Sequence, residues 1–195
     1  GVDRDRSALD QSLAVARDQL ESLRRLASEF SENAREPEAR FGLVVIDDLV
    51  DAVAQTARAA FAGVDLRLER EHPPDSVDGD AEQLRRALHN LIKNAVEVAS
   101  GEPITLRCGS PADESRWWIE IEDRGPGLPG SVAETLGAEQ VSTRTGGSGL
   151  GLAIVSQVAA AHGGTVAART GGGGGTILRL DLSRRPNGQG TGDSA

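Results

Sequence analysis

The stretch AEQLRRALHNLIKNAVEVA, residues 81–99, carries apolar side chains at helical spacing. Asp80 stands directly before it as a suitable N-cap residue, and Ser100-Gly101 follows it as a stop signal. The stretch therefore predicts a helix with one face against a β-sheet. That face consists of Leu84, Leu88, Leu91, Ala95 and Val98.

Three polar residues lie on nearly the opposite face of this helix, because Asn90, Asn94 and Glu97 follow one another at i, i+4 and i+7. A solvated helix face is the commonest explanation of such a trio. Alternatively, two amide oxygens one turn apart are ligands for Mg²⁺, which shares its oxygen ligands between protein, water and phosphates. For Glu97 we favour the solvated surface.

The segments around this helix alternate between predicted strands and helices. Asp47 or Asp48 is the predicted N-cap of a helix that ends near residue 61, and a further helix is predicted at 148–161. Strands are predicted at 42–46, 64–70, 104–108, 117–122, 164–169 and 176–182. Strands 104–108 and 117–122 are expected to pair, and five consecutive glycines join the last two strands. The pattern predicts a compact α/β domain.

An acidic residue followed by glycines ends the strand 117–122. In Asp123-Arg124-Gly125-Pro126-Gly127, the aspartate followed by glycines is typical of a simple turn. It also suits a ligand site, because the carboxylate accepts a hydrogen bond from an amine while bare glycine backbone lets a planar ring approach. A purine with an exocyclic amine fits this arrangement.

A third segment, Gly146-Gly147-Ser148-Gly149-Leu150-Gly151 followed by Leu152-Ala153-Ile154-Val155, runs from glycines into an apolar helix. Free backbone N–H groups and the helix dipole favour an anion at such a place. The segment is not a P-loop, because no Lys-Ser/Thr follows the glycines. It is a poor dinucleotide fingerprint, because a polar loop precedes it.

Together and in this order, the three segments resemble the GHKL ATPase/kinase superfamily and, within it, the sensor histidine kinases. The resemblance covers about residues 41–183 and rests on 89–95 (N box), 123–128 (first glycine box), 142–144 with 147–155 (ATP lid and second glycine box), and 162–164 with 171–175. It implies a Bergerat-type fold. This fold is an α/β (α+β) two-layer sandwich whose mixed, mostly antiparallel sheet has helices on one face.

The resemblance also implies ATP and Mg²⁺ as cofactors. Asp123 would bind the adenine amine, Asn94 would hold Mg²⁺ and Asn90 would help to position metal or phosphates, so the two asparagines are the candidate catalytic residues. Lys93 and Arg144 would pair with phosphate oxygens, although exposed basic residues are more often only solvated. The other expected nucleotide-binding residues are Gly125, Gly127, Thr143, Gly147, Ser148, Gly149, Leu150 and Gly151.

Two positions depart from the family pattern. Lids of the family usually carry a phenylalanine pair, whereas residues 137–141 here read Gly-Ala-Glu-Gln-Val. A mobile lid and a modest nucleotide affinity are therefore expected. Arg124 stands where an asparagine is common.

The N-terminal part predicts a long helix over residues 8–35, whose apolar residues form a heptad seam. Residues 1–35 resemble the second dimerisation helix of the kinases, which implies a homodimer. A linker at 36–41, a catalytic domain at 42–183 and a disordered tail at 184–195 complete the expected organisation.

No histidine has the context of a phosphoacceptor, which is normally beside an acidic residue on the first dimerisation helix. The histidines are His72, His89 and His162, and the helix 8–35 contains none. Because the sequence starts at Gly1 and contains no methionine, a piece of a longer protein is expected. The resemblance implies transfer of the γ-phosphate of Mg·ATP to a histidine on a missing helix, with the receiver domain of a response regulator as partner.

Three other functions stay open. ATPases of the gyrase, mismatch-repair and heat-shock chaperone kind carry a general-base glutamate where this chain has Asn90, which favours phosphotransfer over water activation. A serine kinase of the anti-sigma type would not need the heptad helix. A degenerate nucleotide-binding regulator is compatible with the weak lid.

Composition narrows the partners and the compartment. The 195 residues carry a net charge of −9, which argues against nucleic acid as a partner. No apolar run is long enough to span a bilayer, so no membrane contact is expected for this piece. The single cysteine, Cys108, is predicted to be a core residue in a reducing compartment. A cytoplasmic location is expected, and anchoring of the parent protein in the inner membrane stays open.

Overall fold

The computed structural model describes residues 39–112, 114–127 and 150–185. The chain divides into two compact units, Gly1–Glu38 and Ala39–Ala195, and the described residues all belong to the second. The expected helix 8–35, residues 36–38 of the linker 36–41, the lid with residues 131–136 and 137–141, and most of the tail 184–195 lie outside the described residues.

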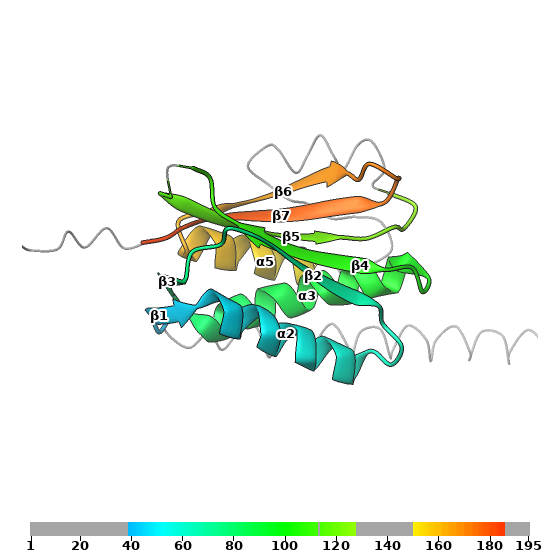
Figure 1. The fold of residues 1–195 in the computed structure, drawn as a ribbon, viewed down its shortest axis with the longest axis horizontal. Helices are drawn as coiled ribbons and strands as arrows, with labels where there is room; N and C mark the ends of the chain where they lie inside the picture. Colours follow the sequence, from blue (N-terminus) through cyan, green and yellow to red (C-terminus); the bar gives the residue numbers. More distant parts are fainter. Residues whose placement is uncertain (1–38, 113, 128–149, 186–195) are drawn as a thin grey trace, which may run out of the picture. The chain divides into compact units, whose positions relative to one another are not determined.

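A five-stranded sheet forms one layer of the described unit, with the strand order β2-β4-β5-β7-β6. Its strands are β2 (Leu66–Glu71), β4 (Ile104–Gly109), β5 (Arg116–Glu122), β7 (Thr176–Ser183) and β6 (Thr165–Thr170). β2 and β4 run parallel, and the other neighbours are antiparallel, including the expected pair β4–β5. The described helices α2 (Ile46–Ala60), α3 (Ala81–Ala99) and α5 (Leu150–Ala161) lie on one face of this sheet (Figure 1). The predicted two-layer fold class is confirmed.

The two faces of β5 show why this sheet has one covered side. Trp117, Ile119 and Ile121 point toward the helices and are each 1% exposed. On the other face, Glu120 is only 3% exposed because Arg169 and Arg179 pair with it, both at 3.1 Å. On the face without helices, ion pairs thus compensate the buried charge of Glu120. On the other face, burial of apolar side chains holds the sheet against the helices. Cys108 is fully buried in the core, as predicted, and burial raises the pKa of its thiol to about 11.

The N-cap predicted for the first described helix is wrong. α2 begins at Ile46 with Val45 as its N-cap, and no side chain caps it. β1 (Gly42–Val45) runs directly into the helix, so Asp47 and Asp48 fall inside its first turn, where the helix dipole favours acidic residues. Asp47 pairs instead with Arg70, at 2.7 Å.

A short strand that the sequence did not predict pairs with β1. This strand, β3 (Ser76–Gly79), follows Pro73-Pro74 and forms a separate two-stranded antiparallel sheet with β1. Val44 and Val77 are partners in it, and both are buried. Leu43 is 80% exposed on the opposite side.

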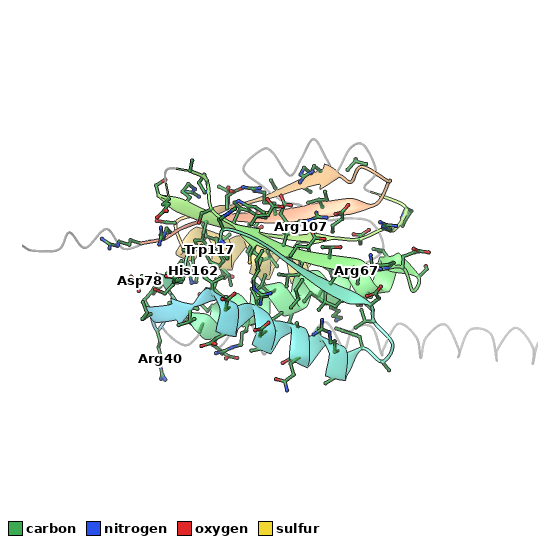
Figure 2. All side chains as sticks on the ribbon, viewed as in Figure 1. Arg40, Arg67, Asp78, Arg107, Trp117 and His162 are labelled. Carbon is green, nitrogen blue, oxygen red and sulfur yellow. The ribbon has the colours of Figure 1, made fainter. Side chains whose placement is uncertain are left out.

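His162 links the start of α3 to the end of α5. Its Nε2 accepts a hydrogen bond from the backbone N–H of Asp80 (2.9 Å), and its Nδ1 contacts the carbonyl of Val158 (2.8 Å), which assigns the proton of the neutral ring to Nδ1. The ring is 1% exposed and lies at the same end of the fold as Asp78 (Figure 2). Burial lowers the pKa of His162, although Val158 and nearby acidic residues oppose this shift. His162 therefore has a structural role.

Asp80 caps α3 as predicted. Its Oδ1 accepts from the backbone N–H groups of Glu82 and Gln83, both at 3.0 Å, and its Oδ2 accepts from the N–H of Arg40 at 2.7 Å. Burial raises the pKa of this carboxyl, but the three N–H donors outweigh burial and lower the pKa overall. At its other end, α3 stops at Ser100, which adopts a left-handed conformation with φ 49°.

Candidate functional site

The N-terminus of α5 lies beside Asn94 of α3. A Cβ placed on Gly151 would be 3.6 Å from both Oδ1 and Nδ2 of Asn94. Asn90 and Asn94 are both half-buried, so this face of α3 is not simply solvated. A side-chain amide here meets the start of a helix, where unpaired N–H groups and the dipole attract anions.

The carboxylate of Asp123 is held in a fixed orientation at the end of β5. The side chain is 5% exposed, and its Oδ1 accepts from the backbone N–H groups of Gly125 (2.8 Å) and Thr176 (3.2 Å). Burial raises the pKa of Asp123, and Glu122 adds to the rise, while the two N–H donors oppose it. The two donors fix the carboxylate in a place where water has little access.

The five-glycine run packs against the turn that carries Asp123. Gly175 adopts φ +74°, and a Cβ there would collide with the backbone oxygen of Asp123. Gly127, with φ +80°, approaches Gly175, since a Cβ on Gly127 would lie 3.5 Å from the backbone oxygen of Gly175. The sequence had suggested that residues 171–175 connect two strands and belong to the family resemblance, but it predicted no contact with Asp123. The missing side chain of Gly175 is in fact needed for this close backbone contact, whereas an added Cβ on Gly172, Gly173 or Gly174 would meet nothing within 4 Å.

Val98 belongs to this region rather than to the sheet. The prediction that it faces the sheet is wrong, because the side chain is 42% exposed. The last turn of α3 lies against the turn after β5. A Cβ on Gly125 would be 3.0 Å from Val98 Cγ2, from the Val98 carbonyl oxygen and from Asp123 Oδ1. Val98 and Gly125 thus pack closely together beside the carboxylate.

The described candidate residues form two groups that are joined by α3. Asp123, Gly125 and Gly127 lie at its C-terminal end, and Asn94 meets Gly151 one turn earlier, about 6 Å along the axis. Asn90 and Lys93 are half-buried on the same helix, and Leu150 begins α5. Five other candidates lie outside the described residues: Thr143, Arg144, Gly147, Ser148 and Gly149.

Two residues of this region were not predicted from the sequence. Thr176 is 6% exposed, and its backbone donates to Oδ1 of Asp123 and accepts from the N–H of Asp123 at 2.9 Å. Val98 was assigned to the wrong face. The only sequence signal for Thr176 was its place directly after the glycine run.

The oxygen donors available here limit the kind of metal site. The described residues contain no cluster of three or more His, Cys, Asp or Glu that could hold a metal ion. A cation at Asn94 would therefore take an amide oxygen from the protein and its remaining ligands from water or a bound anion. That donor set suits Mg²⁺, which often keeps waters and phosphate oxygens as ligands.

Comparison with known proteins identifies the family of this chain. The family model of histidine kinase-, DNA gyrase B- and HSP90-like ATPases matches residues 79–186, more than half of the chain. The sensory histidine kinase/phosphatase NtrB of Rhodobacter capsulatus is 33% identical over 168 residues, which cover 79% of this chain and 46% of that protein. This chain spans less than half the length of the first curated relatives it matches.

Two solved structures share the fold at useful sequence identity. The mycobacterial sensor histidine kinase MprB superposes with a TM-score of 0.62 at 29% identity, covering 75% of this chain and 99% of that one. Full-length ShkA in complex with AMPPNP superposes with a TM-score of 0.66 at 28% identity, covering 85% of this chain and 36% of that one.

The described residues contain no helix that is long and apolar enough to cross a membrane.

The family match, the identity to NtrB and the shared fold all indicate the same family. The chain belongs to the family of histidine kinase-, DNA gyrase B- and HSP90-like ATPases, and its relatives in that family are sensor histidine kinases.

Proposed function

We propose that this chain is the ATP-binding catalytic part of a sensor histidine kinase, which transfers the γ-phosphate of Mg·ATP to a histidine of a dimerisation helix. The observation that carries this proposal is the approach of Gly151 to the amide of Asn94: a Cβ added to Gly151 would lie 3.6 Å from either amide atom. It brings an amide oxygen, which can ligate Mg²⁺, close to a helix N-terminus, whose N–H groups and dipole favour phosphates.

Adenine binds at the other group of residues. Oδ1 of Asp123 is occupied by two backbone donors, so the carboxylate is pre-oriented and its second oxygen accepts from the exocyclic amine. The ring lies over Gly125 and against Val98. A buried acceptor of this kind favours adenine over guanine, because guanine presents a carbonyl oxygen where adenine has its amine.

The phosphates extend from there toward α5. Asn94 supplies an oxygen to Mg²⁺, and Asn90 positions the metal or the terminal phosphates one turn further. Lys93 and, from outside the described residues, Arg144 pair with phosphate oxygens. The glycines 147, 149 and 151 leave backbone N–H groups open to the phosphates.

The chemistry favours transfer to a partner over hydrolysis. Asn90 stands where a water-activating carboxylate would be needed, and an amide cannot take a proton. In the transfer step, the bond from the γ-phosphorus to its bridging oxygen breaks as a bond to the imidazole nitrogen forms, and ADP leaves. Catalysis then depends on positioning and charge stabilisation.

The phosphoacceptor comes from outside this chain. His162 is buried and bonded on both ring nitrogens, His89 stacks on Phe61 with centroids 5.7 Å apart, and His72 follows β2 with φ 52°. Residues 1–35 supply the second dimerisation helix of a homodimer, and the receiver domain of a response regulator takes the phosphoryl group onward. The site acts in the cytoplasm, where ATP is available.

The test uses radiolabelled ATP and two proteins. The chain is incubated alone and then with a longer kinase polypeptide that contains the first dimerisation helix but carries Asn94→Ala. Label is expected only on the longer polypeptide. Strong label on the chain itself, lost on replacing His72 or His89, would contradict the proposal, and so would rapid release of free phosphate.

A further inference from the structure

The residues of α3 follow the bound nucleotide in a fixed order. Val98 touches the turn of Asp123 at Gly125, and Asn94 meets Gly151. Asn90 follows one turn later and Arg86 one turn after that, each step about 6 Å along the helix axis. Since the nucleotide of the proposed function runs from Val98 toward Asn90, Arg86 is the next side chain beyond its phosphates.

Arg86 also differs from the other arginines around it. Its side chain is half-buried, yet within the described part of the chain it forms no hydrogen bond or ion pair. The acid one turn before it, Glu82, is paired with Arg85 at 2.6 Å. In a protein with a net charge of −9, this leaves a cation with no acid paired to it among the described residues, on the face that carries Asn90.

A guanidinium suits one particular partner at this place. Its planar fork binds two oxygens of a phosphoryl group at once, and such charge-assisted pairs are stronger than neutral hydrogen bonds. Arg86 and Lys93 lie at i−4 and i+3 from Asn90, so two cations flank that amide along one helix face. A diphosphate that ends near Asn94 does not extend as far as Arg86, whereas a third phosphoryl group extends toward it.

We propose that Arg86 pairs with the γ-phosphoryl oxygens of the bound triphosphate and lets the site distinguish ATP from ADP. This inference rests on the proposed function, because it takes the direction of the nucleotide from the adenine and phosphate positions. It adds a residue that none of the three sequence motifs led us to expect as a ligand contact.

The test compares a triphosphate with a diphosphate. Affinities of Mg·AMPPNP and Mg·ADP are measured by calorimetry for the unaltered chain, Arg86→Ala and Arg86→Lys. Arg86→Ala should weaken AMPPNP binding about tenfold or more and leave ADP within about twofold. Arg86→Lys should fall in between, since it keeps the charge and loses the fork.

Arg85→Ala is the matched control. It removes the same charge from the neighbouring residue, whose partner Glu82 lies on the exposed side of α3. Both affinities should stay unchanged. Thermal unfolding of each variant shows whether the fold is intact, and the ratio of the two affinities remains interpretable at reduced stability.

The outcomes separate the two proposals. An equal loss of AMPPNP and ADP affinity in Arg86→Ala overturns the γ-phosphoryl assignment, and so does an equal effect of Arg85→Ala, which would indicate net charge alone. If the unaltered chain binds neither nucleotide, the proposed function fails and the inference fails with it. If Arg86→Ala binds ADP tightly and its ratio of AMPPNP to ADP affinity is unchanged, only the inference on Arg86 is refuted.

Discussion

Replacing Asp123 tests the adenine site most directly, provided that its effects on folding and on binding are separated. Asp123→Ala removes the proposed acceptor of the adenine amine. The lost hydrogen bond is charge-assisted, and such a bond contributes about 1.5–3 kcal/mol. This corresponds to an affinity loss of roughly 10- to 150-fold. The same change leaves the N–H groups of Gly125 and Thr176 without their acceptor. Each unsatisfied buried donor costs about 1–3 kcal/mol of folding stability.

Asp123→Asn separates the two effects. The amide oxygen of asparagine still accepts from the two backbone N–H groups, so the unfolding temperature should stay close to that of the unaltered chain. Its NH₂ group then faces the adenine amine as a second donor, and binding should fall at least as far as in Asp123→Ala. Calorimetric titration with Mg·ADP and a thermal unfolding curve are needed for each variant.

The pKa of Asp123 adds a second readout. Burial raises it above the ordinary value of 3.8, so the carboxylate proposed to bind adenine is protonated at a higher pH than an exposed aspartate. Affinity for ADP should therefore decline as the pH falls toward this raised pKa, and the decline should vanish in Asp123→Asn. A folded Asp123→Asn variant that binds ADP as tightly as the unaltered chain would refute the adenine assignment.

Three further predictions concern the metal, the glycine run and the buried histidine. Asn94→Ala should abolish the Mg²⁺-dependent part of ADP binding in calorimetry, whereas Glu97→Ala, on the exposed side of α3, should not; equal effects would contradict the metal assignment. Gly175→Ala should lower the free energy of unfolding by about 1–3 kcal/mol, because φ is +74° at this position and the new Cβ would meet Asp123. Gly173→Ala is the control, because its Cβ would point into open space. Its free energy of unfolding, measured in urea, should stay within about 0.5 kcal/mol of that of the unaltered chain. Burial lowers the pKa of His162 from 6.5, so as the pH falls this histidine is protonated in the unfolded chain before it is protonated in the folded one. The free energy of unfolding should therefore fall as the pH drops below about 6.5. This fall should be smaller in His162→Asn.

The parts of the fold that were predicted well are those with local signals. The bounds of α3 match the prediction, because a capping aspartate and a left-handed serine before glycine act within a few residues of each end. β3 was missed because its four residues carry no alternating pattern of their own, and its existence depends on pairing with β1, about 34 residues earlier in the chain.

The candidate site was predicted in its residues but not in its contacts. Asn94, Asp123 and Gly151 were all identified from motif order, yet nothing in the sequence indicated that the run 171–175 would touch Asp123. Val98 was misassigned because helical spacing gives only a direction around the axis. It does not show where the sheet ends and a neighbouring turn takes its place. The roles of the site residues in binding and catalysis remain predictions.

Two contacts determine how α5 lies along α3, and both involve polar atoms. At one end, His162 just after α5 bonds to the N–H of Asp80 just before α3. At the other end, Gly151 meets Asn94. The two helices therefore run antiparallel, and the bond of the buried histidine fixes their register. Since a helix N-terminus attracts anions only within its first turn, this register decides whether the proposed phosphate-binding end of α5 lies at Asn94 or elsewhere. The proposed nucleotide site would thus depend on a hydrogen bond at the far end of the helix pair, about 20 Å away along α3.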